Sequence, residues 1–414
     1  MAALDDLRND VRQLLTEHFR PDATVRSWWA ALADAGLTAP NWPKPFGRGL
    51  SSEASRIVTE ELVKAGAIAP PQGGVGMRMA GPTLLAHGTE EQKETYLWPL
   101  LRGEESWCQL FSEPGAGSDL PILSTKALLD GDEFVISGQK VWNSAADLAS
   151  RGMLLARTNA DVPKREGITF FLLDMDQPGV EVRPLRQMNG EASFCEVFMT
   201  EVRATHAEIL GEIDAGWTVA RTLVSVERGA TSERAARGLI FLASGAIAGN
   251  LDRTVGEVLG TQEQGGTRFS GSAIPSRAMF QLAREAGPLS PTQRDGLVRY
   301  WVLTEVHKLN LQRARQQTGG TGAEGSIGKL MLGKICNASR DLSFSLLGPA
   351  ATLAGDSAPY GGEIQTVGLS SPGVTIGAGT DEIQRNTMAE RILGLPREED
   401  PSANIPFKET TSAH

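Results

Sequence analysis

The periodicity of the apolar residues changes twice along this chain of 414 residues, and that alternation limits the folds it can adopt. Through roughly the first hundred residues, apolar positions recur every three or four residues, the spacing that places them on one face of a helix. From about Trp107, short apolar runs lie between glycine, proline and aspartate turns, as in a compact β structure. From Trp217 the helical spacing returns. We therefore predict an α+β multidomain chain in which a β domain separates two helical domains.

The predicted boundaries follow these changes. The N-terminal helical domain covers 1–106, with helices at 4–20, 25–36 and 52–66 and a further helix opened by Thr89, where Gln92 is placed to complete a capping box. The middle domain, 107–214, is predicted as a small β-barrel or sandwich with strands near 134–136, 152–156, 168–173 and 180–182. The C-terminal domain, 215–397, is predicted as a four-helix bundle with helical stretches at 217–250, 295–318, 325–347 and 380–394. We expect a mobile loop at 260–275 and a disordered polar tail at 398–414.

Composition excludes several classes of function. A net charge of −10 argues against nucleic acid as a partner, although local cationic groups can still hold a phosphate. The three cysteines, Cys108, Cys195 and Cys336, have no metal-ligand spacing, so we expect buried free thiols and no metal site. No apolar run is long enough to span a membrane, and the charged N-terminus is unlike a signal peptide, so a cytoplasmic protein is expected.

Two short segments carry most of the chemical information. Residues 110–119 read LFSEPGAGSD, and because Gly115 and Gly117 lack a Cβ, backbone N–H groups there can approach a flat polar ligand closely. Residues 138–144 read GQKVWNS on a predicted strand. Trp142 offers an aromatic surface for a ring, and the hydroxyls of Ser112 and Ser144 can hydrogen-bond its edge.

This pair of segments resembles the flavin site of the acyl-CoA dehydrogenase family, and the resemblance extends from about Leu7 to about Pro396. It implies FAD as cofactor and an order of helical, β and helical domains. It also implies these flavin contacts: Gln109, Leu110, Ser112, Gly117, Ser118, Trp142, Ser144, Thr380 and Glu382. Ser118, Arg228 and Ala378 are implied as substrate contacts. Thr380 and Glu382 belong to residues 375–385, TIGAGTDEIQR, a loop that enters a helix and suits a phosphate or ribose contact.

The catalytic base departs from the commonest family pattern. Family members remove two hydrogens from Cα and Cβ of an acyl-CoA thioester: a carboxylate takes the α-proton and flavin N5 takes the hydride. Many members carry a Tyr-Glu pair in which the glutamate is the base, but here those positions are Gly377 and Ala378. The isovaleryl and long-chain types place the base in a Glu-Arg pair on an earlier helix, which corresponds here to Glu227 and Arg228. We therefore expect Glu227 to be the base, while the backbone N–H of Ala378 remains able to bind the thioester oxygen.

Further departures leave the assembly open. The family's Arg-x-x-Phe-Gly and Gln-x-x-Gly-Gly stretches, which bind the flavin of a neighbouring subunit, do not keep their pattern in 260–271 and 345–349. The resemblance includes actinobacterial members that act on steroid side chains and pair two unlike chains. Two assemblies are therefore expected: a homo-oligomer, or a hetero-oligomer with a second acyl-CoA dehydrogenase-like chain.

Three functions are compatible with this sequence. The first is an acyl-CoA dehydrogenase that passes electrons to an electron-transfer flavoprotein, acting on a fatty acyl or steroid side-chain thioester of unspecified length. The second is a flavin-dependent oxidase or monooxygenase on the same fold. The third is a non-catalytic partner subunit of a hetero-oligomeric dehydrogenase, which Ala378 favours and Glu227 opposes.

Overall fold

A computed structural model describes residues 2–230, 239–261, 273–316 and 323–410 of the protein. Two compact units divide the chain. Unit 1 comprises Met1–Leu185, Ser193–Gln264 and Asp400–His414, and unit 2 comprises Arg186–Ala192 and Gly265–Glu399.

Unit 1 begins with the predicted helical region. Its helices are α1 (Ala2–His18), α2 (Val25–Asp34), α3 (Ser52–Lys64), α4 (Gly81–His87) and α5 (Glu90–Leu101). The side chains of Thr24 and Ser51 cap α2 and α3, and the predicted capping box between Thr89 and Gln92 opens α5. The indoles of Trp28 and Trp29 are fully buried, and they donate to the carbonyls of residues 68 and 69 at 2.9 and 2.8 Å. The two indole N–H groups are therefore hydrogen-bonded although they are buried in the apolar core of these helices.

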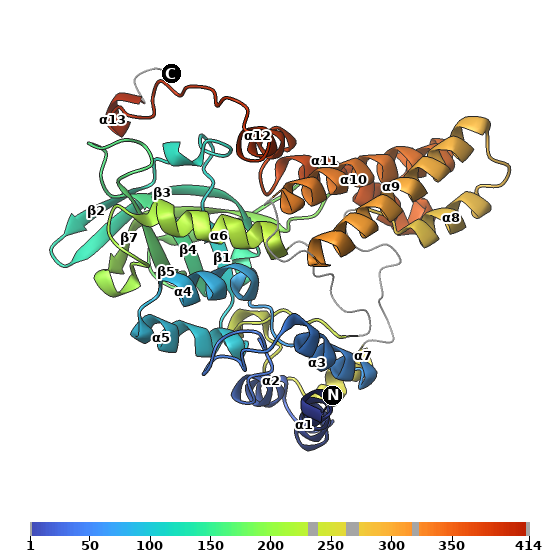
Figure 1. The fold of residues 1–414 in the computed structure, drawn as a ribbon, viewed down its shortest axis with the longest axis horizontal. Helices are drawn as coiled ribbons and strands as arrows, with labels where there is room; N and C mark the ends of the chain where they lie inside the picture. Colours follow the sequence, from blue (N-terminus) through green and yellow to red (C-terminus); the bar gives the residue numbers. More distant parts are fainter. Residues whose placement is uncertain (1, 231–238, 262–272, 317–322, 411–414) are drawn as a thin grey trace. The chain divides into compact units, whose positions relative to one another are not determined.

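The middle of unit 1 is a seven-stranded sheet (Figure 1). Its strands are β1 (Trp107–Leu110), β2 (Lys126–Asp130), β3 (Glu133–Ser144), β4 (Arg151–Arg157), β5 (Ile168–Asp174), β6 (Val180–Leu185) and β7 (Phe194–Thr205). The order is β1-β4-β2-β3-β7-β6, and β5 pairs with β4. The sheet curls, because Phe134 of β3 and Phe171 of β5 meet at a ring distance of 5.4 Å although β2 and β4 lie between their strands. The middle region is thus one curved sheet, closer to an open barrel than to a sandwich.

The predicted helical stretch 217–250 is only partly helical. The helix α6 covers Gly216–Ala230, and residues 231–238 lie outside the described part of the chain. Residues 239–250 do not form an α-helix, because Gly245 and Gly249 adopt φ angles of 92° and 69° and the backbone of Ile240 pairs with Ala67 and Ala69 instead. Unit 1 continues with α7 (Val255–Thr261). The helical expectation for 239–250 was therefore wrong, since backbone pairing to the N-terminal region replaces helical bonds.

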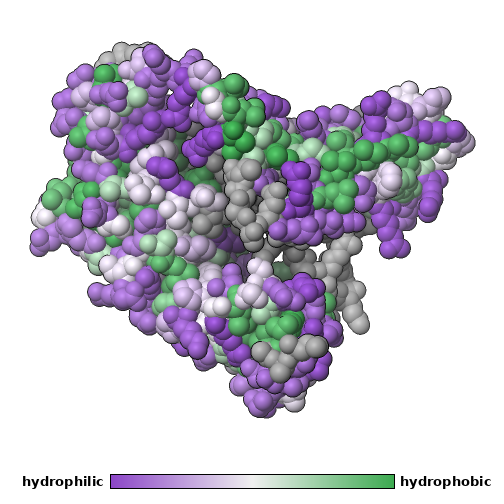
Figure 2. Space-filling model, viewed as in Figure 1, coloured by the Kyte–Doolittle hydropathy of each residue, from purple (hydrophilic) through white to green (hydrophobic). Residues whose placement is uncertain are grey.

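Unit 2 is helical. It contains α8 (Ser276–Glu285), α9 (Pro291–Gln316), α10 (Glu324–Leu347), α11 (Glu363–Ile376) and α12 (Asp381–Arg391), and α10 packs against α8, α9, α11 and α12 (Figure 1). On the face shown in Figure 2, hydrophobic residues follow these helices between hydrophilic ones. The C-terminal region is helical as predicted, whereas its assignment as a four-helix bundle stays a prediction.

The predicted mobile loop at 260–275 falls largely on residues 262–272, which lie outside the described part. Its last residues are not loosely held: Ile274 is 1% exposed, and its N–H donates to the Ser339 hydroxyl at 2.9 Å. Helices α8 and α11 were missed by the sequence interpretation. Gly373 and Pro372 near the end of α11 obscure its helical signal, since both residue types disfavour helix interiors.

The polar tail is ordered where the structure describes it. A short helix, α13 (Phe407–Thr410), ends the described chain, and the Phe407 side chain is 7% exposed. The backbone N–H groups of Phe407 and Lys408 donate to the carbonyls of Val162 and Ala160. The expectation of a disordered tail was therefore wrong for residues 400–410, because one apolar side chain and backbone pairing fix them to unit 1.

The thiols of Cys108, Cys195 and Cys336 are free and buried. Burial raises the pKa of each thiol above its ordinary value, which suits inert core residues. In the described parts of the chain, no helix is both long and apolar enough to cross a membrane. Among the same residues, no cluster of His, Cys, Asp and Glu side chains could hold a metal ion.

Candidate active site

The two motif segments lie side by side in unit 1. The Val141 N–H donates to the Ser112 carbonyl at 2.9 Å, and the Asn143 amide donates to the Gln109 carbonyl at 2.7 Å. The ammonium of Lys140 adds a bond of 3.0 Å to the Phe111 carbonyl. The end of β1 and the following glycine-rich loop, residues 111–119, are thereby fixed along β3.

A buried ion pair holds this junction. Lys140 is fully buried, and its ammonium lies 2.8 Å from the Glu113 carboxylate, which is also buried. Glu113 also accepts from the backbone N–H groups of Ser124 and Thr125 at 2.7 and 2.9 Å, so it ties both ends of the loop together. Burial raises the pKa of Glu113, but the charge and hydrogen bonds it receives outweigh burial and hold that pKa at about 2. Burial lowers the pKa of Lys140 to about 8, since Glu113 offsets only part of the lost hydration.

The tip of the loop is open. A Cβ added at Gly115 or Gly117 would meet no atom within 4 Å, and neither glycine has a positive φ. Ser118 is exposed beside them, whereas Phe111 and Ala116 are anchored in the core. The protein's own packing therefore does not require glycine at these two positions.

Trp142 has an unusual conformation for a bulky residue. Its φ is 63°, at an irregularity in the β3–β7 register between Lys140 and Asn143. The indole is 58% exposed, and its ring meets Phe194 edge-on at 6.0 Å. The neighbouring Asn143 Oδ1 is buried and has no hydrogen-bond partner in the described protein. An exposed aromatic face thus lies next to a buried acceptor that lacks a donor, and a strained backbone of this kind often marks a functional position.

The predicted site residues divide between the two units. Unit 1 contains Gln109, Leu110, Ser112, Gly117, Ser118, Trp142 and Ser144, which the structure brings together on β1, its loop and β3. Unit 2 contains Ala378, Thr380 and Glu382, which lie together at the start of α12.

The loop before α12 is well supported within unit 2. Thr380 caps α12 by accepting from the Ile383 N–H, while Ala378 and Gly379 adopt φ angles of 53° and 83°. The fully buried Gln384 donates to the Ala378 carbonyl at 3.0 Å and accepts from the Ser326 hydroxyl at 2.7 Å. Glu382 is exposed in the first turn, where the helix dipole favours an anion. This left-handed turn gives the Ala378 backbone a defined orientation.

Glu227 and Arg228 lie on the last turn of α6, and their side chains are outside the described part of the structure. Among residues 216–225 of α6, whose burial the structure describes, the buried ones are Gly216, Val219, Ala220 and Leu223. Position 227 follows Leu223 by four residues and Ala220 by seven, so it continues the same face of the helix. Val219, Ala220 and Leu223 share a core cluster with Phe111 and Ala116 of the glycine-rich loop.

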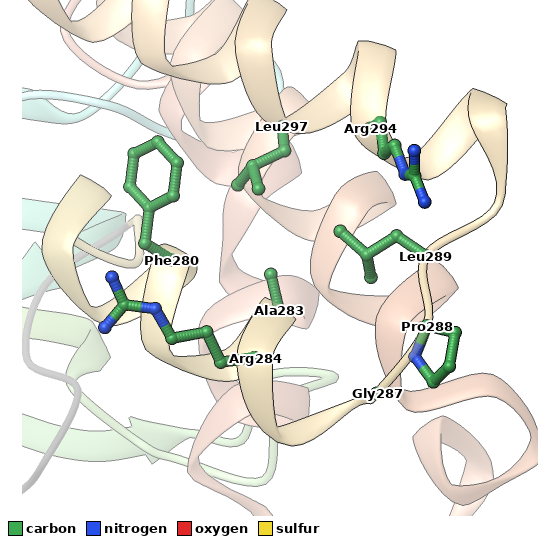
Figure 3. Close-up of a pocket in the computed structure, with 8 residues that line it drawn as sticks. All are labelled: Phe280, Ala283, Arg284, Gly287, Pro288, Leu289, Arg294 and Leu297. Carbon is green, nitrogen blue, oxygen red and sulfur yellow. The ribbon is translucent and has the colours of Figure 1, made fainter.

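A cavity of about 330 Å³ lies in unit 2 between α8 and α9 (Figure 3). It is lined by Phe280, Ala283, Arg284, Gly287, Pro288, Leu289, Arg294 and Leu297. In the close-up, Ala283, Leu289 and Leu297 gather in the middle, while the guanidinium groups of Arg284 and Arg294 point away toward opposite ends. None of the sequence-predicted site residues lines this cavity.

Sequence reasoning missed the residues that support the site. Glu113, Lys140 and Asn143 all lie within the two motif segments but were not singled out. The available signal was the lone ammonium of Lys140 on a predicted strand, because a charge in a buried strand requires a partner, and Glu113 is one of two carboxylates in the preceding segment. The pairing of Glu113 with Lys140, 27 residues apart in the chain, could not be predicted without the fold.

Comparison with known proteins assigns the family. The chain matches the models "Acyl-CoA dehydrogenase, N-terminal domain" over residues 2–104 and "Acyl-CoA dehydrogenase, middle domain" over residues 108–202. It is 34% identical to the acyl-CoA dehydrogenase IpdE1 of Mycobacterium tuberculosis over 380 residues, which is 90% of this chain and 88% of that relative. It is 38% identical to the acyl-CoA dehydrogenase FadE34 of the same organism over 370 residues, which is 89% of this chain but only 46% of that longer relative.

Solved structures give the same assignment. The ChsE4–ChsE5 complex from Mycobacterium tuberculosis matches with a TM-score of 0.66 and 26% identity, covering 96% of this chain and 99% of that one. A steroid acyl-CoA dehydrogenase, Tcur3481–Tcur3483, matches with a TM-score of 0.67 and 27% identity over 96% and 99% of the two chains. The chain therefore belongs to the acyl-CoA dehydrogenase family of FAD-dependent oxidoreductases.

Proposed function

We propose that the protein catalyses α,β-dehydrogenation of an acyl-CoA thioester to the trans-2-enoyl-CoA, with Glu227 as the base that removes the α-proton. The observation that carries this proposal is the common core of unit 1. In that core, the buried face of α6, which position 227 continues, packs together with Phe111 and Ala116 of the glycine-rich loop.

The residues present fit FAD. Open space at Gly115 and Gly117, the exposed indole of Trp142 and the unpaired Asn143 Oδ1 together suit a flat ring that carries hydrogen-bond donors. Gln109, Leu110, Ser112, Trp142 and Ser144 would hold the ring, and Gly117 and Ser118 the pyrophosphate. From unit 2, Thr380 and Glu382 are proposed as further flavin contacts. Bound FAD would supply a hydride acceptor for the β-hydrogen.

The chain's own groups would handle the proton and the thioester. Position 227 continues the helix face of the apolar residues of α6. A carboxylate proposed there would be a stronger base where hydration is poor, because desolvation raises the proton affinity of a carboxylate. The N–H of Ala378 is proposed to donate to the thioester oxygen as negative charge grows there. Ser118 and Arg228 are proposed as additional substrate contacts.

The substrate is proposed to be a fatty acyl-CoA or a steroid side-chain acyl-CoA, because the similar structures include one named as a steroid acyl-CoA dehydrogenase. The proposed electron acceptor is an electron-transfer flavoprotein.

The proposal is tested by mixing the purified protein with a panel of acyl-CoAs under anaerobic conditions while recording flavin absorbance. Bleaching by a fatty acyl-CoA or a steroid side-chain acyl-CoA is expected and would identify the substrate class. Reduced flavin that reoxidises rapidly in oxygen would favour an oxidase or monooxygenase instead. A flavin-loaded protein that no acyl-CoA bleaches would contradict the proposal.

The base is tested with Glu227→Gln. We expect flavin content to be unchanged and the bleaching rate to fall by about 10²–10⁴-fold, the usual contribution of a general base. The matched control is Glu212→Gln, an exposed glutamate just before α6, which should bleach at the normal rate. Normal bleaching by Glu227→Gln would refute the assignment of the base.

A second candidate is a non-catalytic subunit that needs an active homologue, and two observations favour it. Ala378 stands where many family members have the base, and one similar structure is titled as a complex of two chains, ChsE4 and ChsE5. A colourless protein that gains flavin only when it is co-expressed with a second acyl-CoA dehydrogenase chain would support this candidate.

A further inference from the structure

The C-terminal residues 400–410, here called the strap, pair with the connection between β4 and β5. The N–H of Phe407 donates to the Val162 carbonyl at 2.8 Å, and the N–H of Lys408 donates to the Ala160 carbonyl at 3.0 Å. An isolated bridge joins Pro406 to Pro163, and the Lys408 ammonium lies 2.6 Å from Asp161. Backbone bonds therefore fix the strap against this connection.

The strap shares a buried cation with the glycine-rich loop. The Lys164 side chain is 4% exposed, and its ammonium lies 2.9 Å from both the Asp400 carboxylate of the strap and the Asp119 carboxylate that ends the loop. Burial lowers the pKa of Lys164, but the two carboxylates outweigh burial and raise it above its ordinary value. The Ser402 hydroxyl and Lys164 hold the pKa of Asp400 at about 2. The bridge from strap to loop is therefore charged at neutral pH.

The strap also covers a second cation beneath the loop. The guanidinium of Arg157 donates to the carbonyls of Pro121 and Leu123, at 2.6 and 3.4 Å, just after the loop. The Phe407 ring covers this guanidinium at 3.8 Å, and Arg157 is only 3% exposed. Shielding from water strengthens the bonds of Arg157 to those carbonyls, because they lie in a medium of lower dielectric constant.

We infer that the strap positions the glycine-rich loop for FAD, with Asp400 acting through Lys164 and Phe407 acting through Arg157. This inference rests on the proposed placement of FAD at that loop. Asp400 and Phe407 are positioning residues, since the groups they touch are Lys164 and Arg157. Loss of either contact should loosen residues 119–123, at and just after the end of the loop, while the sheet stays intact.

The first test measures the FAD affinity of the whole 414-residue chain. FAD is removed, and its rebinding is followed by flavin fluorescence. Phe407→Ala removes a desolvated aromatic–cation contact, and Asp400→Asn removes one counter-charge of Lys164. Each is expected to weaken FAD binding on the order of tenfold. Phe407→Tyr and Asp400→Glu should restore most of the affinity. The matched control is Lys408→Ala, which removes an exposed ion pair of the same strap and should leave affinity unchanged.

The second test needs no cofactor. In the FAD-free protein, Phe407→Ala should speed hydrogen exchange at the amides of Ile122 and Leu123. These amides donate to the carbonyls of Asp119 and Leu120 in the turn that follows the loop. Amides shared by β3 and β7 should exchange at their normal rates. Faster exchange across the whole sheet would mean general destabilisation and would overturn the inference.

The variant Gly117→Ala distinguishes failure of the strap's positioning role from failure of the proposed flavin site. If Gly117→Ala weakens FAD binding and the strap variants leave it within twofold, the inference about the strap is wrong while the proposed flavin site stands. If neither kind of variant changes affinity, the proposed flavin site is wrong and the inference falls with it.

Discussion

At the scale of single residues, a substitution at Gly117 tests the flavin site without disturbing the packing of the protein. Because a Cβ there meets no protein atom within 4 Å and φ is not positive, Gly117→Ala should leave the unfolding free energy within about 0.5–1 kcal/mol. FAD affinity should nevertheless fall about tenfold or more, since the added methyl would occupy space that the cofactor needs. Fluorescence titration and denaturant unfolding of the FAD-free protein measure the two effects.

Gly103→Ala serves as the opposite control. Its φ is 68°, and an added Cβ would approach Trp29 at 2.3 Å, so this change should destabilise the fold by more than 1 kcal/mol. Weakened folding with Gly117→Ala, or unchanged FAD affinity, would contradict a role in cofactor binding.

The buried pair of Glu113 and Lys140 makes a second prediction at this scale. Lys140→Met should destabilise the protein by about 3–5 kcal/mol, because it leaves the Glu113 carboxylate buried without its counter-charge. The double variant Glu113→Gln/Lys140→Met should lose less unfolding free energy than the sum of the losses in Glu113→Gln and Lys140→Met. Urea denaturation gives all three values, and strictly additive costs would show that the two side chains are not coupled.

The glycine-rich loop could be recognised from the sequence, but the buried side chains that hold it in place could not. Glycines, hydroxyls and an indole in two segments were enough to predict a ring-binding site. The unusual backbone of Trp142 was not predictable, because its positive φ depends on an irregularity between β3 and β7 that no local pattern encodes.

At the scale of elements, Glu61 joins α3 to α1. Its buried carboxylate lies 2.7 Å from Arg12, 2.6 Å from Lys64 and 2.8 Å from Arg8. Hydrogen bonds from Arg12 and Lys64 lower the pKa of Glu61 from 4.5 to about 2. Glu61→Gln should therefore destabilise the protein by about 1–3 kcal/mol at pH 7.

The pH dependence of that difference has a defined sign. A carboxyl with a lowered pKa in the folded state stabilises above its ordinary pKa, and this contribution is lost as the pH falls through the folded value. The difference between the unmodified protein and Glu61→Gln should therefore be complete above about pH 5 and shrink between about pH 4.5 and 2. The control is Glu60→Gln, whose side chain is 37% exposed and should contribute under about 1 kcal/mol. A difference that did not change with pH would rule out the ion pairs as its source.

Elements with clear end signals were the most predictable. The capping box of α5 was found from Thr89 and Gln92 alone, since a cap depends on neighbouring residues only. Residues 239–250 were mistaken for helix because their bonds go to Ala67 and Ala69, far back in the chain. Local periodicity carries no information about such partners.

At the scale of the whole molecule, α9 has an exposed apolar row. Val298, Val302, Val306 and Leu309 are 43–60% exposed and recur at helical spacing. Exposed rows of this kind mark contacts between chains, and we expect this one to contact a second acyl-CoA dehydrogenase chain. Val302→Glu should lower the mass of the purified assembly measured by light scattering. The control Lys308→Ala, at an exposed ion pair on the same helix, should leave the mass unchanged.

Whether that second chain is identical or different was not predictable from the sequence. The sequence signal for an unlike partner chain would be a missing catalytic group. Ala378 gives that signal only if Glu227 does not act as the base. Mass spectrometry of the intact assembly distinguishes one kind of chain from two.

The buried thiols allow the two units to be followed separately as they unfold. Cys108 and Cys195 belong to unit 1 and Cys336 to unit 2, and all three are shielded in the folded state. Pulsed alkylation at increasing urea, read by peptide mass, would therefore record when each unit exposes its interior. Coincident labelling of Cys108 and Cys336 would mean that the units unfold as one cooperative system, whereas separate midpoints would give each unit its own stability.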